Sequence, residues 1–200
     1  MNRLLICLFV SVASISSARG DSAGMILLAY DEADKDYKVL IAASKDTDSR
    51  YRETLCGTKK EGESDLNAAA REVYEEARHK YDKAFLLMKL VKAHEKKWHV
   101  KMDGTTLFVA VVHLIDAKKL EAASTDCEGC NERKSFAWVP EKTLRKIVSD
   151  PKGKHLIPDE YLAGNKLRPA YQRFSAKMYV EAVPFIEAAI RDDIKSRKKR

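Results

Sequence analysis

Residues 57 to 79, GTKKEGESDLNAAAREVYEEARH, carry the most informative pattern in this chain. It opens with a polar loop that contains two glycines. The loop leads into a segment with apolar residues at Leu66, Ala69, Ala70, Val73 and Ala77. This spacing places one apolar stripe along a helix. We therefore predict a helix over residues 66 to 81 that buries one face.

The same segment carries a concentration of acidic residues. Glu72, Glu75 and Glu76 lie three and four positions apart, so they project side by side from one helix face. Three carboxylates on one face repel one another and destabilise an isolated helix unless a cation compensates them. Mg²⁺ prefers oxygen ligands and is commonly held by one or two carboxylates together with substrate phosphates. The alternative is an acidic face that only contacts solvent.

The loop and the helix together form a fixed frame. It resembles the Nudix box, G-x5-E-x7-R-E-U-x-E-E-x-G-U, in which U is a bulky aliphatic residue. The matching residues are Gly57, Glu63, Arg71, Glu72, Val73, Glu75 and Glu76. The chain departs from the box at its last two positions, where Arg78 replaces the glycine and His79 the aliphatic residue. Because that glycine normally ends the helix in a left-handed turn, Arg78 predicts a helix that continues or closes differently.

The resemblance implies a Nudix-like α/β/α sandwich with a mixed sheet. It also implies a metal-dependent hydrolase that cleaves a pyrophosphate bond in a nucleoside diphosphate derivative or a related diphosphate. The cofactor would be Mg²⁺ or Mn²⁺. Such ions neutralise the anionic oxygens of the substrate and acidify a bound water. They also hold the water and the substrate in line for attack at phosphorus.

The roles of the box residues also follow from the resemblance. Glu75 and Glu76 would be the principal metal ligands, and Glu72 a further ligand or the base that deprotonates water. Glu63 would be a nearby carboxylate that often reaches the metal through water. Arg71 would orient the glutamates by ion pairing, for which its planar, always charged guanidinium is suited.

Two further groups would complete the metal site. One is the backbone carbonyl of Cys56 or Gly57. The other is a carboxylate outside the box, for which Glu132 is our candidate, because residues 131 to 139, NERKSFAWV, resemble a segment of the family that contains such a glutamate. Glu128 is the alternative, and both could equally be solvated loop residues.

The substrate is left open by the sequence. Residues 68 to 76 also look like the box of diphosphoinositol polyphosphate phosphohydrolases, whose substrates are highly anionic. Lys59, Lys96 and Arg133 are candidates for substrate contacts. Nucleotide sugars, dinucleoside polyphosphates and ADP-ribose are other candidates. A catalytically silent Nudix-fold protein that only binds its ligand is the second class of function, indicated by Arg78 and His79.

The remaining segments predict a mixed sheet with helices on its faces. Strands are expected at residues 23 to 30 and 37 to 43, as a hairpin, and at 84 to 93. A second hairpin is expected from residues 99 to 113, around Asp103 and Gly104, followed by a strand at 135 to 139. Helices are expected at residues 140 to 149 and 171 to 196, the latter long and with a kink or restart at Pro184.

The two ends of the chain differ from the body. Residues 1 to 18 combine a short positive start, a short apolar run and small residues before Arg19, which is the layout of a signal peptide cut near Ala18. An uncleaved anchor is the alternative. We therefore expect a secreted or periplasmic protein with a single Nudix-like domain over residues 19 to 194 and a basic tail over 195 to 200.

Composition restricts the partners. The chain has 200 residues, of which 45% are hydrophobic and 34% charged, as expected for one globular domain. The net charge of +7 resides mostly in the tail, so the nearly neutral body does not favour a nucleic-acid partner. A membrane contact through the tail is left open, as is the oligomeric state. Cys127 and Cys130 could form a local disulfide or be free thiols; a zinc site would need more ligands.

Overall fold

The computed structural model describes residues 21–44, 52–123, 126, 129–130, 132–149, 157 and 173–199. In this part of the chain seven strands form one mixed sheet with the order β3-β2-β1-β6-β5, to which β4 and β7 add by pairing with β1 and β2. The strands are β1 Ser22–Asp31, β2 Asp36–Ser44, β3 Arg52–Glu53, β4 Leu55–Thr58, β5 His99–Met102, β6 Thr105–Val112 and β7 Arg133–Pro140.

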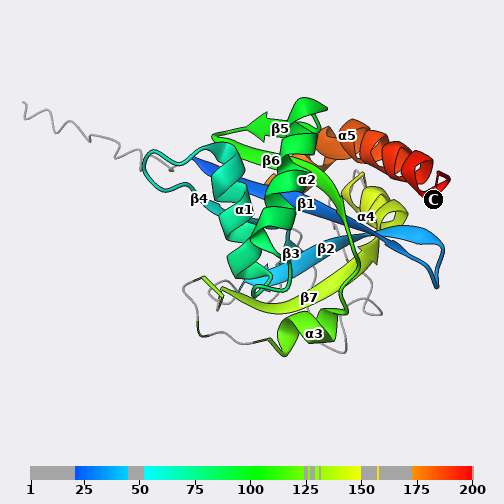
Figure 1. Ribbon diagram of the computed structural model, residues 1–200, viewed down its shortest axis with the longest axis horizontal. Helices are drawn as coiled ribbons and strands as arrows, with labels where there is room; N and C mark the ends of the chain where they lie inside the picture. The colour runs from blue at the N-terminus through cyan, green and yellow to red at the C-terminus, as the bar shows by residue number, and fades with distance from the viewer. Residues whose placement is uncertain are drawn as a thin grey trace, which may run out of the picture.

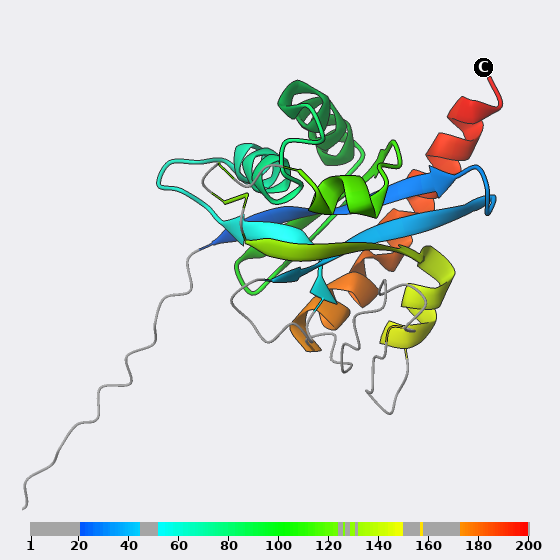
Figure 2. The same ribbon diagram turned by 90° about the horizontal axis from the view of Figure 1, so that it is seen from below.

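Helices cover both faces of the sheet, as Figure 2 shows. They are α1 Asp65–Glu76, α2 Lys83–Glu95, α3 Ala117–Glu121, α4 Glu141–Val148 and α5 Arg173–Arg197. The first three pack on one face and the last two on the other, and α1 lies beside α2 (Figures 1 and 2). The predicted α/β/α sandwich with a mixed sheet and a long C-terminal helix is therefore confirmed.

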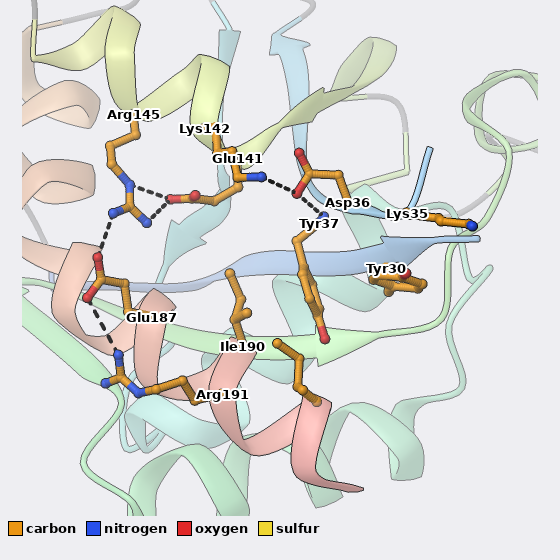
Figure 3. A pocket seen from close by; sticks show the side chains of 11 residues that line it. Tyr30, Lys35, Asp36, Tyr37, Glu141, Lys142, Arg145, Glu187, Ile190 and Arg191 are labelled. Atoms are coloured by element: carbon orange, nitrogen blue, oxygen red, sulfur yellow. Dashed lines mark hydrogen bonds and ion pairs between the residues drawn. The ribbon is translucent and has the colours of Figure 1, made fainter. Parts of the chain in front are cut away.

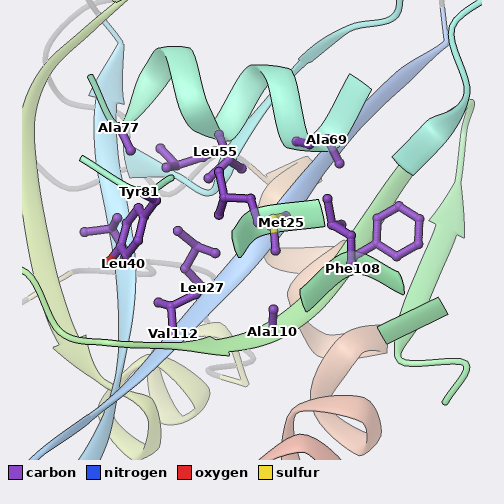
Figure 4. Close-up of a cluster of buried hydrophobic side chains, with 14 of the residues drawn as sticks. Met25, Leu27, Leu40, Leu55, Ala69, Ala77, Tyr81, Phe108, Ala110 and Val112 are labelled. Atoms are coloured by element: carbon purple, nitrogen blue, oxygen red, sulfur yellow. The ribbon is translucent and has the colours of Figure 1, made fainter. Parts of the chain in front are cut away.

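The central strand β1 explains why there are two cores. Strand side chains alternate between faces, so Met25 and Leu27 enter the cluster beneath α1 and α2, while Ile26 and Leu28 enter the cluster beneath α4 and α5. Figure 4 shows the first of these clusters. β1 pairs in parallel with β6 and antiparallel with β2 and β4, so both of its edges are paired, and the two clusters bury its two faces.

One predicted strand is wrong. Residues 84 to 93 belong to α2, which begins after Asp82, whose side chain accepts a hydrogen bond from the backbone N–H of Phe85. Leu86, Leu90 and Ala93 are the buried residues of this helix. Their spacing of four and three is helical, and the segment lacks the strict alternation of a half-buried strand. Its many apolar residues concealed that spacing.

The end of α1 also differs from expectation. The helix ends at Glu76 instead of residue 81, because Arg78 and His79 take positive φ angles of 53° and 59°. The chain thus makes the left-handed turn that a glycine would make, without the glycine. A smaller difference is that β4 includes Gly57 and Thr58, the first residues of the expected polar loop. The long C-terminal helix is present as α5 with Pro184 inside it, so the helix does not restart there.

Both predicted hairpins are confirmed. β1 pairs antiparallel with β2, and β5 with β6 around Asp103 and Gly104, which both have positive φ. Residues 1 to 18 lie outside the described residues, so the signal peptide stays a prediction. Within the described ranges, no helix combines the length and the apolar character needed to cross a membrane. α5 continues to Arg197, so the expected basic tail begins inside the helix.

Candidate metal centre

α1 carries the acidic residues to the edge of the core. The Ser64 side chain caps the helix by accepting a hydrogen bond from the backbone N–H of Asn67. The following alanines and Val73 pack onto the sheet with no exposed surface. Glu72 and Glu76 lie on the side of the helix next to this apolar stripe, so both carboxylates are buried as well.

Three carboxylates converge at this point. Glu72, Glu76 and Glu132 each offer an oxygen atom, and these atoms lie within 4.8 Å of one another. Glu132 is exposed, whereas Glu76 has no exposed surface. Oε2 of Glu76 is buried without a hydrogen-bond partner. A buried orphan oxygen beside two more carboxylates fits a hard divalent cation that takes oxygen ligands.

Glycines let the surrounding loops approach these glutamates closely. A Cβ atom at Gly57 would collide with the carboxylate of Glu72. A Cβ atom at Gly129 would lie 2.9 Å from Oε2 of Glu75. The box glycine on β4 is therefore required by the space that Glu72 occupies, independently of any resemblance.

Arg71 ties the loop to the helix. Its Nε and Nη2 donate to the two carboxylate oxygens of Glu63 at 3.0 and 2.8 Å, and its Nη1 donates to Glu72 Oε1 at 2.7 Å. A longer contact of 3.4 Å reaches Glu75. The bond from Arg71 is the largest cause that lowers the pKa of Glu63 to about 2. Arg71 thus orients three glutamates, and Glu63 is turned toward Arg71.

Arg133 occupies a different place from the one proposed for a substrate contact. Its side chain is buried, and its Nε donates to Glu76 Oε1 at 2.7 Å. Nη1 lies 3.3 Å from a carboxylate oxygen of Glu53, and Nη2 donates to the backbone carbonyl of Cys56. Arg133 is therefore an internal counter-ion of Glu76. Nothing in the sequence marks this role, because the two residues are 57 positions apart.

The electrostatics of the cluster follow from burial. Burial raises the pKa of Glu76 to about 8, although the nearby Arg133 acts in the opposite direction. Burial also raises the pKa of Glu72, against the effect of Arg71. Without a cation, the cluster therefore holds a proton near neutral pH. A divalent ion would replace that proton, which makes cation binding dependent on pH.

The two residues that depart from the box contact other segments around the site. The Arg78 guanidinium donates to the backbone carbonyls of Leu120, Glu121 and Arg133. The His79 ring stacks on Tyr74 with centroids 4.1 Å apart. His79 Nε2 also lies 3.4 Å from Sγ of Cys130, which is disulfide-bonded. Both departures thus support the segment that carries Glu132.

The other candidate residues are placed as follows. Lys59 pairs with Asp65 at 2.6 Å, and Lys96 caps the C-terminal end of α2. The structure therefore does not gather Lys59, Lys96 and Arg133 into one basic surface. Glu75 is beside the three-carboxylate cluster without belonging to it, and Glu128 lies outside the described residues.

Comparison with known proteins finds similar folds only. No protein-family model matches the chain, and no curated protein sequence matches it. Among solved structures, a mutT/nudix family protein from Listeria innocua has a TM-score of 0.46 at 14% identity, covering 88% of this chain and 96% of that one. The Ap4A hydrolase of C. elegans has a TM-score of 0.40 at 15% identity, covering 66% and 87%.

A third similar structure is the NUDIX domain of Shewanella oneidensis NrtR, complexed with ADP ribose. Its TM-score is 0.41 at 13% identity, and the match covers 82% of this chain and 84% of that one. Two of the three are Nudix proteins by name. At these identities and TM-scores the likeness carries no inference about what this chain does. The functional proposal therefore depends on the residues of the site.

Proposed function

We propose that the protein is a metal-dependent hydrolase that cleaves a pyrophosphate bond in a nucleoside diphosphate derivative or a related diphosphate. The observation that carries the proposal is the convergence of Glu72, Glu76 and Glu132, with a buried Glu76 oxygen that has no partner. The residues also match the Nudix box at every position expected to supply a metal ligand.

The residues of the site would have separate roles. Glu72, Glu76 and Glu132 would hold Mg²⁺ or Mn²⁺, with Glu75 beside them as a further ligand. When bound, the ion neutralises phosphate charge and acidifies a water molecule. Arg71 fixes the orientation of Glu72, and Arg133 keeps Glu76 in place and favours its ionised form. Exposed Glu132 is at the side from which substrate and water would enter.

The test is a hydrolysis screen over a panel of diphosphates, namely nucleotide sugars, dinucleoside polyphosphates, ADP-ribose and a diphosphoinositol polyphosphate, with the products separated by ion-exchange chromatography. Each is assayed with Mg²⁺ and with Mn²⁺. We expect turnover of at least one of them, and a loss of at least ~10²-fold in kcat for Glu76→Gln. Activity of that variant within about threefold of the wild type would show that the cluster does not carry the reaction.

A catalytically silent ligand-binding protein is the second candidate. The observation that favours it is the pairing of Glu76 Oε1 with Arg133, because an internal cation already neutralises part of the charge that a metal would neutralise. Calorimetric binding of one panel member, combined with no turnover of any, is the expected result under this alternative.

We further propose that residues 1 to 18 are a cleaved signal peptide and that the protein is secreted or periplasmic. The three-part layout of this segment supports the proposal. Intact-mass analysis of protein expressed with its native N-terminus tests it. A mass that begins near Arg19 is expected, and a retained Met1 would contradict the localisation.

A further inference from the structure

A second concave site lies on the face of the sheet opposite α1. It is a pocket of about 620 Å³ between the β1–β2 hairpin, α4 and α5 (Figure 3). β7 begins beside the candidate metal centre at Arg133 and ends at Pro140, immediately before the residues of α4 that line the pocket. The pocket is therefore separate from the metal centre. Its volume lies within the range of small-molecule binding sites.

The centre of the pocket is aromatic and aliphatic. The rings of Tyr30 and Tyr37 meet edge to face with centroids 5.2 Å apart, and Ile190 and Ile194 come from α5. Figure 3 shows Tyr37 and Ile190 at the centre, with charged residues on either side. Ile194 leaves 39% of its surface exposed. A flat apolar molecule would cover Tyr30 and the two isoleucines, because Tyr37 itself is only 5% exposed.

The charged residues of the lining leave an excess of positive charge. Asp36, Glu141 and Glu187 line the pocket together with Lys35, Lys142, Arg145 and Arg191. Each carboxylate already has a cationic partner: Asp36 pairs with Lys142, and the other two with Arg145. Within the described part of the chain, Lys35 forms no ion pair. A cationic ligand would have to displace the present partner of a carboxylate, whereas an anionic ligand could pair with Lys35.

We propose that this pocket binds a flat, largely apolar organic molecule that carries one anionic group. The apolar body packs against Tyr30 and the two isoleucines, and the anionic group faces Lys35 at the turn of the hairpin. Lys35 has a positive φ of 51°, so the left-handed turn fixes its backbone next to the pocket. The inference does not depend on the metal centre or on hydrolysis.

The test uses two fluorescent probes with the same rings and different charge. Anilinonaphthalene sulfonate is anionic, and phenylnaphthylamine is its neutral counterpart. We expect the sulfonate to bind the full-length protein with a stoichiometry of one, and at least about threefold more tightly than the neutral probe. Equal affinities would refute the anionic class of ligand. A stoichiometry well above one would show general surface adsorption and would refute a defined site.

Matched variants locate the bound probe. Ile194→Asp should weaken sulfonate binding about tenfold or more, whereas Leu114→Asp should leave it unchanged, although Leu114 is 38% exposed and so nearly as accessible. Lys35→Glu should weaken sulfonate binding about tenfold without affecting the neutral probe, and Lys83→Glu on α2 controls for the change in net charge. All four positions are exposed, so the fold should be kept, as circular dichroism can verify.

Two results would overturn the proposal. If Ile194→Asp and Lys35→Glu bind the sulfonate as the wild type does, the probe sits elsewhere and this pocket is not its site. If the control variants lose as much affinity as these two, the effect is general and the assignment to the pocket is wrong.

Discussion

Replacing Arg78 by glycine, the residue that the Nudix box has at this position, should destabilise this protein. Arg78 occupies the position after the C-cap of α1 with a φ of 53°, where glycine relieves about 1 kcal/mol of backbone strain. Its guanidinium, however, donates to three backbone carbonyls on α3 and β7. Hydrogen bonds to charged groups contribute about 1.5–3 kcal/mol each, less the cost of burying the charge. We expect a net loss of about 2 kcal/mol or more.

A matched control separates the backbone from the side chain. Lys97 also follows the C-cap of a helix, α2, and has a φ of 57°, but its exposed side chain makes no hydrogen bond or ion pair within the described residues. Lys97→Gly should therefore stabilise the protein by up to about 1 kcal/mol, in contrast to Arg78→Gly.

Urea denaturation followed by circular dichroism measures both effects as changes in midpoint. The Arg78→Gly variant should also bind Mn²⁺ more weakly in calorimetry, because the segment before Arg133 that carries Glu132 loses its support. If Arg78→Gly is as stable as the wild type, or is stabilised like Lys97→Gly, the three hydrogen bonds contribute nothing and our account of this departure from the box is wrong.

Further predictions concern the metal centre and the C-terminus. Arg133→Gln removes the counter-ion of buried Glu76 and should lower the free energy of unfolding by about 3 kcal/mol in urea denaturation at pH 8. An unchanged free energy of unfolding would show that the ion pair does not stabilise the fold. Because burial raises the pKa of Glu76 to about 8, the folded metal-free protein holds a proton that the unfolded chain releases. The melting temperature of the metal-free protein should therefore fall as the pH rises from about 5 to 8, and Mg²⁺ added at pH 8 should raise that temperature again. Glu76→Gln, which cannot ionise, should abolish most of this pH dependence. Deleting residues 198 to 200 should leave hydrolysis unchanged and weaken adsorption to anionic vesicles by roughly 1 kcal/mol per basic residue. A deletion variant that loses activity at 150 mM salt would show that the C-terminus contributes to the site.

The parts of the fold that the sequence predicts well are those with a local signal. The hairpin around Asp103 and Gly104 and the apolar stripe of α1 depend on neighbours along the chain, and both are present. The strand expected at residues 84 to 93 failed because α2 is apolar over most of its surface, so its helical spacing is hard to separate from a buried strand. The parallel pairing of β1 with β6 depends on distant residues and had no local signal.

The residues of the candidate site also differ in whether the local sequence predicts their positions. Arg71 and the glutamates of α1 lie within one or two turns of each other, so their proximity follows from helix geometry. Glu132 was expected from a resemblance alone, and the structure places it beside Glu72 and Glu76. The role of Arg133 could not be predicted, because only the folded sheet brings the start of β7 against the end of α1.

Three arginines together explain how so many carboxylates are held in one place. Arg71 binds glutamates on its own helix and loop, Arg133 neutralises Glu76 from β7, and Arg78 fixes the backbone carbonyl of Arg133 itself. The last contact links the two ends of the site, because the residue that replaces the box glycine positions the residue that pairs with the buried glutamate. A chain with glycine at position 78 would need another way to hold β7. The departure from the box and the internal counter-ion are therefore parts of one arrangement, and Arg78→Gly and Arg133→Gln should show non-additive effects in a double-mutant cycle.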